Sequence, residues 1–320
     1  MELRASLRAM GSTISLAVRV PRSDAEAARQ VLAAEAAWFQ EVERRLTRFD
    51  PESELSRLNR LAGQWCVVSP LLYAALSAAA RAHRLTGGLF DPSILPALER
   101  WGYDRDFREM PGRIRPGDPA FQAPVPESPS PRLVAPGGSG FAPRALPLTL
   151  DPVARAVRLE QGARLDLGGI VKGLAADSSL RRLASRFPAA LVDAGGDIAG
   201  LAKDGMPPWR IALPMRGLGL PHALRVRRGG VATSATARRW VGPPGRAHHL
   251  IDPRTQAPAD SGLEMVTVVA RSAATAEVLA KALLIGGPDA TPYLLGQVPP
   301  AEAFWRTGCG KVGTYRCPSG

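Results

Sequence analysis

The sequence has few cysteines and no long apolar run, and both absences narrow its class. Its 320 residues include 3 cysteines, Cys66, Cys309 and Cys317. Their spacing matches no metal-binding motif, and the odd count argues against a disulfide framework, although Cys309 and Cys317 could pair. No stretch reaches the ~18 apolar residues of a membrane span, and the first 20 residues hold no run of signal-peptide length. We therefore expect a cytoplasmic protein of a reducing compartment, without stable membrane insertion.

Clustered charge is lacking as well. The formal net charge is +12, but only 22% of the residues are charged and the arginines are scattered along the chain. A nucleic-acid surface would gather basic residues in a stripe with interleaved aromatics, and the sequence shows none. The Walker pattern GxxxxGK[ST] and the dinucleotide pattern GxGxxG are also absent. These observations exclude the common nucleic-acid and nucleotide motifs and indicate a small anionic ligand.

What the chain does contain is enough apolar material for a large core. Hydrophobic residues make up 45% of it, which allows one large or two moderate domains. Short apolar alternations predict strands in a sheet that is at least partly antiparallel. We expect strands at 7–20 with a break at 10–13, and at 156–159, 189–192, 209–213, 224–226, 230–233 and 265–270. Helical periodicity and end signals predict helices at 23–46, 70–86, 93–101, 170–187 and 273–285, with a turn-like segment at 54–59.

Residues 107–152 differ from the rest of the chain. They contain 11 of the 30 prolines and a glycine-rich stretch at 137–140. Such composition is typical of an irregular surface excursion. Because strands are expected again at 156, we interpret it as an insertion into a single domain spanning 1–320.

One stretch, ARLDLGGIVKGLAAD at 163–177, combines features of a ligand site. Gly168 and Gly169 stand between an apolar alternation, which we interpret as a strand, and a helix. There, backbone N–H groups and the helix dipole favour an anion. Lys172 adds a positive charge, while Asp166 and Asp177 flank the turn. The alternative is a plain tight turn without a ligand.

Four further features allow both a functional and a structural interpretation. The DAGGD segment at 193–197 is a second turn that permits close approach. His249 with Asp252 three residues later could be a general base and its orienting group, or part of an ordinary surface loop. Glu277 and Lys281 lie one helical turn apart and would by default form an ion pair. Asp91 before a proline usually caps a turn.

The order of the motifs is more specific than any single one. Together they resemble the ApbE family, the FAD:protein FMN transferases. The motifs are RAMGST (8–13), LTRFDPESELSRLN (46–59), GGLFDPSILPALERWGY (87–103), LDLGGIVKGLAAD (165–177), LVDAGGDI (191–198), VATS (231–234) and HHLIDPRT (248–255). The resemblance implies an α+β fold with antiparallel sheets, packed helices and FAD in a crevice between two lobes. The implied reaction transfers FMN from FAD to a Ser or Thr hydroxyl of an acceptor flavoprotein and releases AMP.

The resemblance also implies roles for individual residues. His249 would be the general base that deprotonates the acceptor hydroxyl. Met10 would lie by the flavin and Phe49 would stack on an aromatic ring of FAD. The remaining FAD contacts would come from Leu89, Phe90, Asp91, Asp166, Lys172 and Ile251. A Mg²⁺ ion at the diphosphate would be held by the Gly169 carbonyl and the Glu277 carboxylate.

The chain departs from the family pattern on the diphosphate side. Lys281 stands where the family has an oxygen ligand to the metal, and an ammonium group has no lone pair for a cation. Gln256 replaces a glycine, and the segment 234–237 replaces an SGxY motif. Besides an active FMN transferase, two alternatives therefore stay open. One is a slow or non-catalytic FAD-binding protein for flavin storage, delivery or regulation, and the other is an FAD diphosphate hydrolase.

Overall fold

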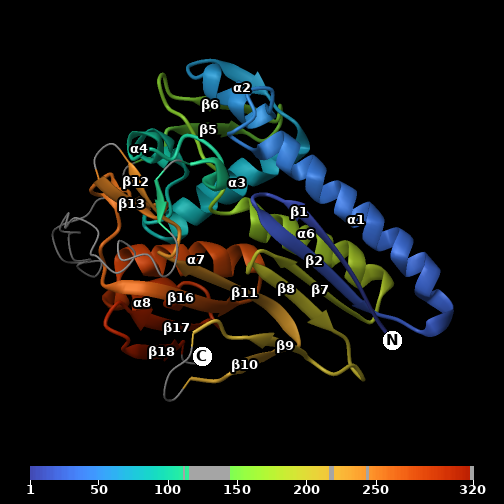
Figure 1. Cartoon of the computed structure of the whole chain (residues 1–320). Coiled ribbons are helices and arrows are strands. Elements are labelled where there is room, and N and C mark those ends of the chain that lie inside the picture. The colour runs from blue at the N-terminus through green and yellow to red at the C-terminus, as the bar shows by residue number, and fades with distance from the viewer. Residues whose placement is uncertain (111, 115–144, 216–219, 243–244, 318–320) are drawn as a thin grey trace.

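An eight-stranded antiparallel sheet forms the centre of the molecule (Figure 1). The computed structural model describes residues 1–110, 112–114, 145–215, 220–242 and 245–317. The strand order is β1-β2-β7-β8-β11-β16-β17-β18. The bounds are β1 Glu2–Ala9, β2 Ser12–Arg19, β7 Ala189–Ala194, β8 Ile198–Ala202, β11 Arg228–Ala235, β16 Leu263–Ala270, β17 Glu302–Thr307 and β18 Val312–Arg316.

Helices cover one face of this sheet, and the hairpin formed by residues 209–212 and 223–226 contacts its strand β8. Helix α6 (Val171–Arg186) packs on β7 and β8, and α7 (Ala273–Gly286) packs on β11 and β16. Helix α1 (Ala25–Leu46) runs beside β1 and α6. In β2 the alternating residues Ile14, Leu16 and Val18 are fully buried in the core shared with α1 and α6. The period-2 pattern of the strand thus places one side of β2 in that core.

A second group of elements forms the upper lobe in Figure 1. It contains α2 (Glu54–Arg60), α3 (Pro70–Leu85) and α4 (Leu95–Arg100), with the small sheet β3-β6-β5. The strands of that small sheet are β3 Trp65–Val67, β5 Leu148–Asp151 and β6 Ala156–Leu159. The remaining strands are β4 Arg113–Ile114, β9 Trp209–Ala212, β10 Ala223–Val226, β12 Arg239–Gly242, β13 Gly245–His248, β14 Ile251–Asp252 and β15 Ala257–Pro258. The remaining helix is α8 Thr291–Gly296, and the 3₁₀ turns are η1 Arg22–Asp24, η2 Pro92–Ile94, η3 Phe107–Glu109 and η4 Pro288–Ala290. The expected α+β class with antiparallel sheets is confirmed.

Several local expectations were wrong. The break in residues 7–20 is a two-residue turn, Met10–Gly11, that joins two antiparallel strands. The segment at 54–59 is helix α2, whose cap is the Ser53 side chain accepting from the Ser56 N–H at 3.0 Å. Helix α1 begins at Ala25 with Asp24 at its N-cap position, two residues later than the expected start at Ser23. Residues 163–167 form no strand, and the Leu165 backbone there bonds to the Asn59 side chain.

Most of the proline-rich insertion, namely 111 and 115–144, lies outside the described residues. The described parts of 107–152 hold η3, β4 and β5, so a strand resumes at Leu148, earlier than expected. Cys309 and Cys317, which could have paired, are both free thiols. No helix in the described part of the chain is both long and apolar enough to cross a membrane.

Candidate active site

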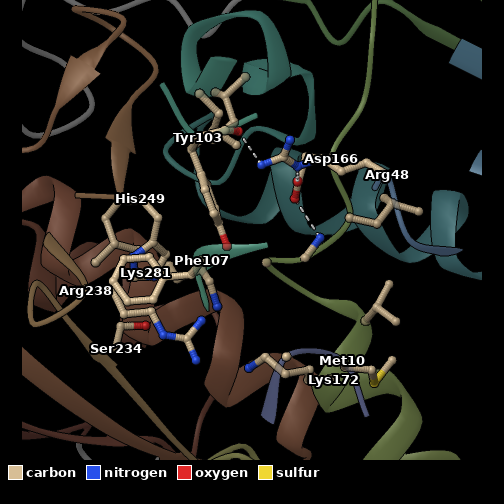
Figure 2. Close-up of a pocket in the computed structure, with 18 of the residues that line it drawn as sticks. Met10, Arg48, Tyr103, Phe107, Asp166, Lys172, Ser234, Arg238, His249 and Lys281 are labelled. Carbon is tan, nitrogen blue, oxygen red and sulfur yellow. Dashed lines mark hydrogen bonds and ion pairs between the residues drawn. The ribbon is translucent and has the colours of Figure 1, made fainter. Parts of the chain in front are cut away.

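A cavity of about 430 Å³ lies where the two lobes meet. Its walls come from the β1–β2 turn, the end of α1, the loop before η2, the start of α6, β11, the loop before β14, and α7. Figure 2 shows charged side chains from both lobes directed into it. The sequence-predicted residues that line the cavity are Met10, Phe49, Leu89, Phe90, Asp91, Asp166, Gly169, Lys172, His249 and Ile251. The structure thus brings together all but one of the predicted site residues, and the exception, Glu277, lies just beneath the wall.

Lys172 links the two glycine turns that the sequence singled out. Its ammonium pairs with Asp197, from the second turn, and lies 3.5 Å from Glu277 Oε1. Burial by itself would lower the pKa of Lys172, but the carboxylates of Asp197 and Glu277 raise it on balance. Lys172 is therefore a permanent cation at the cavity wall.

Glu277 is a completely buried carboxylate with both oxygens occupied. Oε1 accepts from the Lys281 ammonium at 3.0 Å, and Oε2 accepts from the Gly173 backbone N–H at 2.8 Å. Burial alone would raise the pKa of Glu277, but Lys281 and Lys172 lower it on balance. The expected ion pair one helical turn apart is confirmed, and it lies inside the molecule.

Asp177, which the sequence placed beside the ligand turn, has a structural role. Its carboxylate accepts from the backbone N–H groups of Ala273 and Ala274 at 2.8 and 3.0 Å. It therefore caps the start of α7 from α6. The expectation that Asp177 flanks the ligand was wrong, because the residue lies on the second turn of α6 and faces the neighbouring helix.

The residues at the expected magnesium position do not fit a divalent cation. Mg²⁺ requires near-octahedral oxygen ligands, but both Glu277 oxygens are already in use. The Lys281 side chain also runs along Gly169, since a β-carbon on Gly169 would lie 3.5 Å from Lys281 Cδ and Cε. Two unit charges about 4 Å apart interact by ~4 kcal/mol at an effective dielectric near 20. An ammonium at that position would therefore strongly repel a divalent ion.

The two adjacent histidines differ in their hydrogen-bond partners and in their position relative to the cavity. His248 is buried, with Nε2 3.0 Å from the Ala259 carbonyl and Nδ1 accepting from the Leu250 N–H at 3.3 Å. Burial lowers its pKa to about 4. His249 lines the cavity, and its Nδ1 is buried without a hydrogen-bond partner among the described residues. His248 is therefore held by the backbone, and His249 is free to act on a ligand.

His249 is held neutral by its environment. Burial is the largest cause that lowers its pKa well below the usual value, followed by the charge of Arg238. The expected orienting partner, Asp252, is instead paired with Arg254 at 2.6 Å. The alternative in which Asp252 orients His249 is therefore wrong. A neutral imidazole is nevertheless the form that accepts a proton at pH 7.

The other end of the cavity is aromatic. The Arg48 guanidinium lies 4.2 Å from the Phe49 ring centroid and 4.8 Å from that of Tyr103. It also forms an ion pair with Asp166, with Nε 2.6 Å from Oδ2. Phe49 remains 41% exposed. Arg48 therefore holds the ring while one side stays available for stacking.

The loop from Leu89 to Asp91 is rigidly held. Leu89 and Phe90 are buried, and the Phe90 carbonyl lies 3.1 Å from His83 Nδ1. Asp91 Oδ1 accepts from the backbone N–H and the hydroxyl of Ser93 at 2.7 and 2.6 Å. The loop thus contributes fixed surface to the cavity, and Asp91 also caps η2 as the structural interpretation expected.

Arg48, Tyr103 and Arg238 are among the residues of the cavity wall that sequence reasoning missed. The first two lie within the quoted motifs 46–59 and 87–103, whose basic and aromatic residues were a usable signal. Arg238 follows the segment 234–237, where the chain leaves the family pattern. Its guanidinium lies 5.9 Å from the Phe107 ring centroid, and no carboxylate of the described chain forms an ion pair with it.

Two backbone positions near the site have left-handed conformations on residues other than glycine. Met10 has φ 54° and its N–H donates to Glu43 Oε1 at 2.7 Å. Gln256, at the position where the family has glycine, has φ 57°. Such a conformation costs roughly 1–2 kcal/mol on a residue with a β-carbon. Residue 256 therefore has the left-handed backbone conformation that favours glycine, although it is a glutamine.

Comparisons with known proteins identify relatives of the chain. The model of the ApbE family matches residues 10–305. The chain is 32% identical over 287 residues to an FAD:protein FMN transferase of Rhodobacter capsulatus, covering 87% of this chain and 50% of that relative. It is 30% identical to an FAD:protein FMN transferase of Treponema pallidum, covering 79% and 70% of the two chains. The chain thus spans half the length of the first relative.

Solved structures share the fold over nearly the whole chain. The ApbE protein of Thermotoga maritima superposes with a TM-score of 0.77 and 25% identity, covering 99% of this chain and 97% of that one. The flavin transferase ApbE of Vibrio cholerae has a TM-score of 0.72 at 24% identity, with 100% and 98% covered. The second similarity supports the fold alone.

Proposed function

Because the chain belongs to the ApbE family, we propose that it transfers FMN from FAD to a Ser or Thr hydroxyl of an acceptor flavoprotein and releases AMP. The observation that carries the proposal is a neutral histidine, His249, in the same cavity as two lysine ammonium groups. That combination supplies a base for a hydroxyl and positive charge for a diphosphate. Both are required for phosphoryl transfer.

In this proposal the cavity holds FAD as a substrate. Phe49 stacks on the adenine, and the fixed loop of Leu89, Phe90 and Asp91 lines the adenosine end. At the other end, Met10 lies by the flavin. Lys172 contacts the diphosphate, and Asp166 and Ile251 complete the FAD contacts. The support for this arrangement is that all these residues line one cavity of about 430 Å³.

The proposed chemical step is a single displacement at the phosphorus of the FMN half. His249 accepts the proton of the acceptor hydroxyl as its oxygen attacks that phosphorus. The bond between this phosphorus and the bridging oxygen breaks, and AMP leaves with that oxygen and its electron pair. The FMN phosphate ends as a phosphodiester on the acceptor. No step of this proposal passes through a metal ion, since the residues at the expected magnesium position do not fit one.

The test is to incubate the protein with FAD and a flavoprotein domain that carries a known Ser or Thr flavinylation site. Mass spectrometry of the acceptor should show covalent FMN, and chromatography should show AMP in equal amount. An acceptor with that residue changed to Ala is the control and should stay unmodified. Free FMN and AMP without an adduct would instead indicate the diphosphate hydrolase. Bound but intact FAD would indicate storage or delivery.

A further inference from the structure

Lys281 reaches the floor of the cavity from the middle of α7. Its side chain is only 16% exposed, and its ammonium donates to Glu277 Oε1 at 3.0 Å. The carbon stem passes close to Gly169. The ammonium thus lies between Gly169 and a buried carboxylate, which is the place where a bound cation would be expected. In this structure the side chain does not extend into solvent.

Two further cations surround the same place. Lys172 lies 3.5 Å from the same Glu277 oxygen. Arg238 lines the same cavity as Lys172, His249 and Lys281, and its positive charge acts to lower the pKa values of Lys172 and His249. Figure 2 shows Lys172, Arg238 and Lys281 directed toward one opening. Glu277 and Asp197, the acids that pair with the two lysines, carry two negative charges, and Arg238 adds a third positive charge to the same cavity.

Both oxygens of Glu277 are used within the protein, so this carboxylate is not free to bind a cation, whereas the floor has N–H donors to spare. An ammonium has three N–H donors, and Lys281 directs one of them at Glu277. The remaining donors can bind phosphate oxygens, for which charge-assisted hydrogen bonds are well suited. A guanidinium on the opposite wall can bind a second phosphate in the same way.

We propose that Lys281, together with Lys172 and Arg238, takes the place of a divalent metal ion, so that this protein binds and cleaves the FAD diphosphate without one. This inference rests on the proposed function. In the displacement, Lys281 and Lys172 neutralise the charge that develops on the oxygen of the departing AMP. The protein thereby carries its own counter-ion.

The first experiment uses the unmodified protein. FAD is titrated by flavin fluorescence in buffer with a chelator and in buffer with excess Mg²⁺. We expect the two dissociation constants to agree within about twofold, because no ligand set for the metal is available. FAD binding that is tenfold or more tighter with Mg²⁺ would overturn the inference and leave the proposed function intact. Absence of FAD binding in both buffers would contradict the proposed function itself.

The second experiment changes the cation. Lys281→Thr removes the ammonium and supplies an oxygen, whereas Lys281→Met removes the ammonium alone. In chelator we expect both variants to bind FAD about tenfold more weakly, the usual effect of losing one charge-assisted hydrogen bond. Mg²⁺ should restore binding to Lys281→Thr and not to Lys281→Met.

Lys311→Thr, at an exposed position away from the cavity, is the matched control and should bind FAD as the unmodified protein does. Titration with Mn²⁺ in the presence of FAD gives a second readout, in which only Lys281→Thr should bind the metal. Tight Mn²⁺ binding by the unmodified protein would contradict the inference. So would full FAD affinity of Lys281→Met in chelator. The first experiment uses only the unmodified protein, so it tests the inference even if a variant misfolds.

Discussion

His248 and His249 are neighbours in the chain but take part in different interactions. His248 is fixed by the Ala259 carbonyl and the Leu250 N–H, and His249 faces the cavity. We expect His249→Ala to leave FAD affinity nearly unchanged and to lower the rate of FMN transfer roughly 10²–10⁴-fold. We expect His248→Ala to lower the unfolding temperature and to affect transfer much less. Equal transfer defects in the two variants at matched stability would mean that the base is misassigned.

The surroundings of His249 also set the pH dependence. Burial and the nearby cations lower its pKa well below the usual value, so the imidazole loses its proton at a lower pH than a free histidine does. The base is therefore available above that lowered pKa. We expect kcat/KM for FMN transfer to stay level as the pH falls from ~8 through the ordinary histidine pKa near 6.5. A loss of activity centred near pH 6.5, absent from His249→Ala, would contradict this.

For single residues, the sequence predicted which positions belong to the site better than it predicted which residues they pair with. Lys172 was recognised as a cation, but its partner Asp197 is 25 residues away on the other glycine turn. Spacing alone suggested Asp252 as one possible partner of His249, but Arg254, two residues further on, pairs with it instead. Spacing indicates contact on a helix, where Glu277 and Lys281 do pair, but it carries little information in a loop. Long-range pairs depend on the assembled fold.

The junction of α6 and α7 is the element on which the site depends. The helices approach so closely at Gly173 that a β-carbon there would lie 2.6 Å from Ala274 Cα. The Gly173 N–H also binds Glu277, and Asp177 one turn later caps α7. The two helices therefore position Lys172 and Lys281 as one unit.

We expect Gly173→Ala to destabilise the protein by roughly 1–3 kcal/mol, because the helices must separate to admit the methyl group. Urea unfolding measures the change. Gly296→Ala, where a β-carbon meets no atom within 4 Å, is the matched control and should change stability by about 0.5 kcal/mol or less. If Gly173→Ala is no less stable than Gly296→Ala, the close approach is not required.

The long elements and the short strands β6, β9 and β10 were predictable from the sequence, whereas helix α2 and the chain before Gly168 were not. Helices α3, α6 and α7 and strand β16 follow the predicted ranges closely, since their apolar periodicity extends over many residues. Helix α2 has only 7 residues, too few for a clear period. The chain before Gly168, where a strand was expected, forms no strand and bonds to the side chain of Asn59 and to the backbone of Pro92, contacts that no local pattern encodes.

For the molecule as a whole, the proposed function requires the two lobes to supply different parts of one FAD site. We expect FAD to bind more tightly than FMN or riboflavin, because only FAD reaches both the aromatic end and the lysine end of the cavity. Phe49→Ala should weaken FAD binding roughly 5- to 100-fold, the effect of one lost stacking contact, and leave FMN binding unchanged. Fluorescence titration of the three flavins decides this, and equal affinities for FAD and FMN would remove the adenosine assignment.

The α+β class and the gathering of distant motifs in one cavity were accessible from the sequence because seven motifs kept their order. The inward direction of Lys281 was not accessible, since a lysine on a helix can equally reach into solvent. The cytoplasmic location expected from the sequence stays a prediction.

The central claim is that one cavity holds the FAD diphosphate between His249 and the ammonium groups of Lys172 and Lys281. A crystal structure with FAD bound in the presence of Mg²⁺ tests it most directly. We predict phosphate oxygens within hydrogen-bonding distance of both ammonium groups, the His249 ring next to the phosphorus of the FMN half, and the adenine on Phe49. An octahedral metal ion between Gly169 and Glu277 with Lys281 displaced, or FAD bound outside this cavity, would contradict the account.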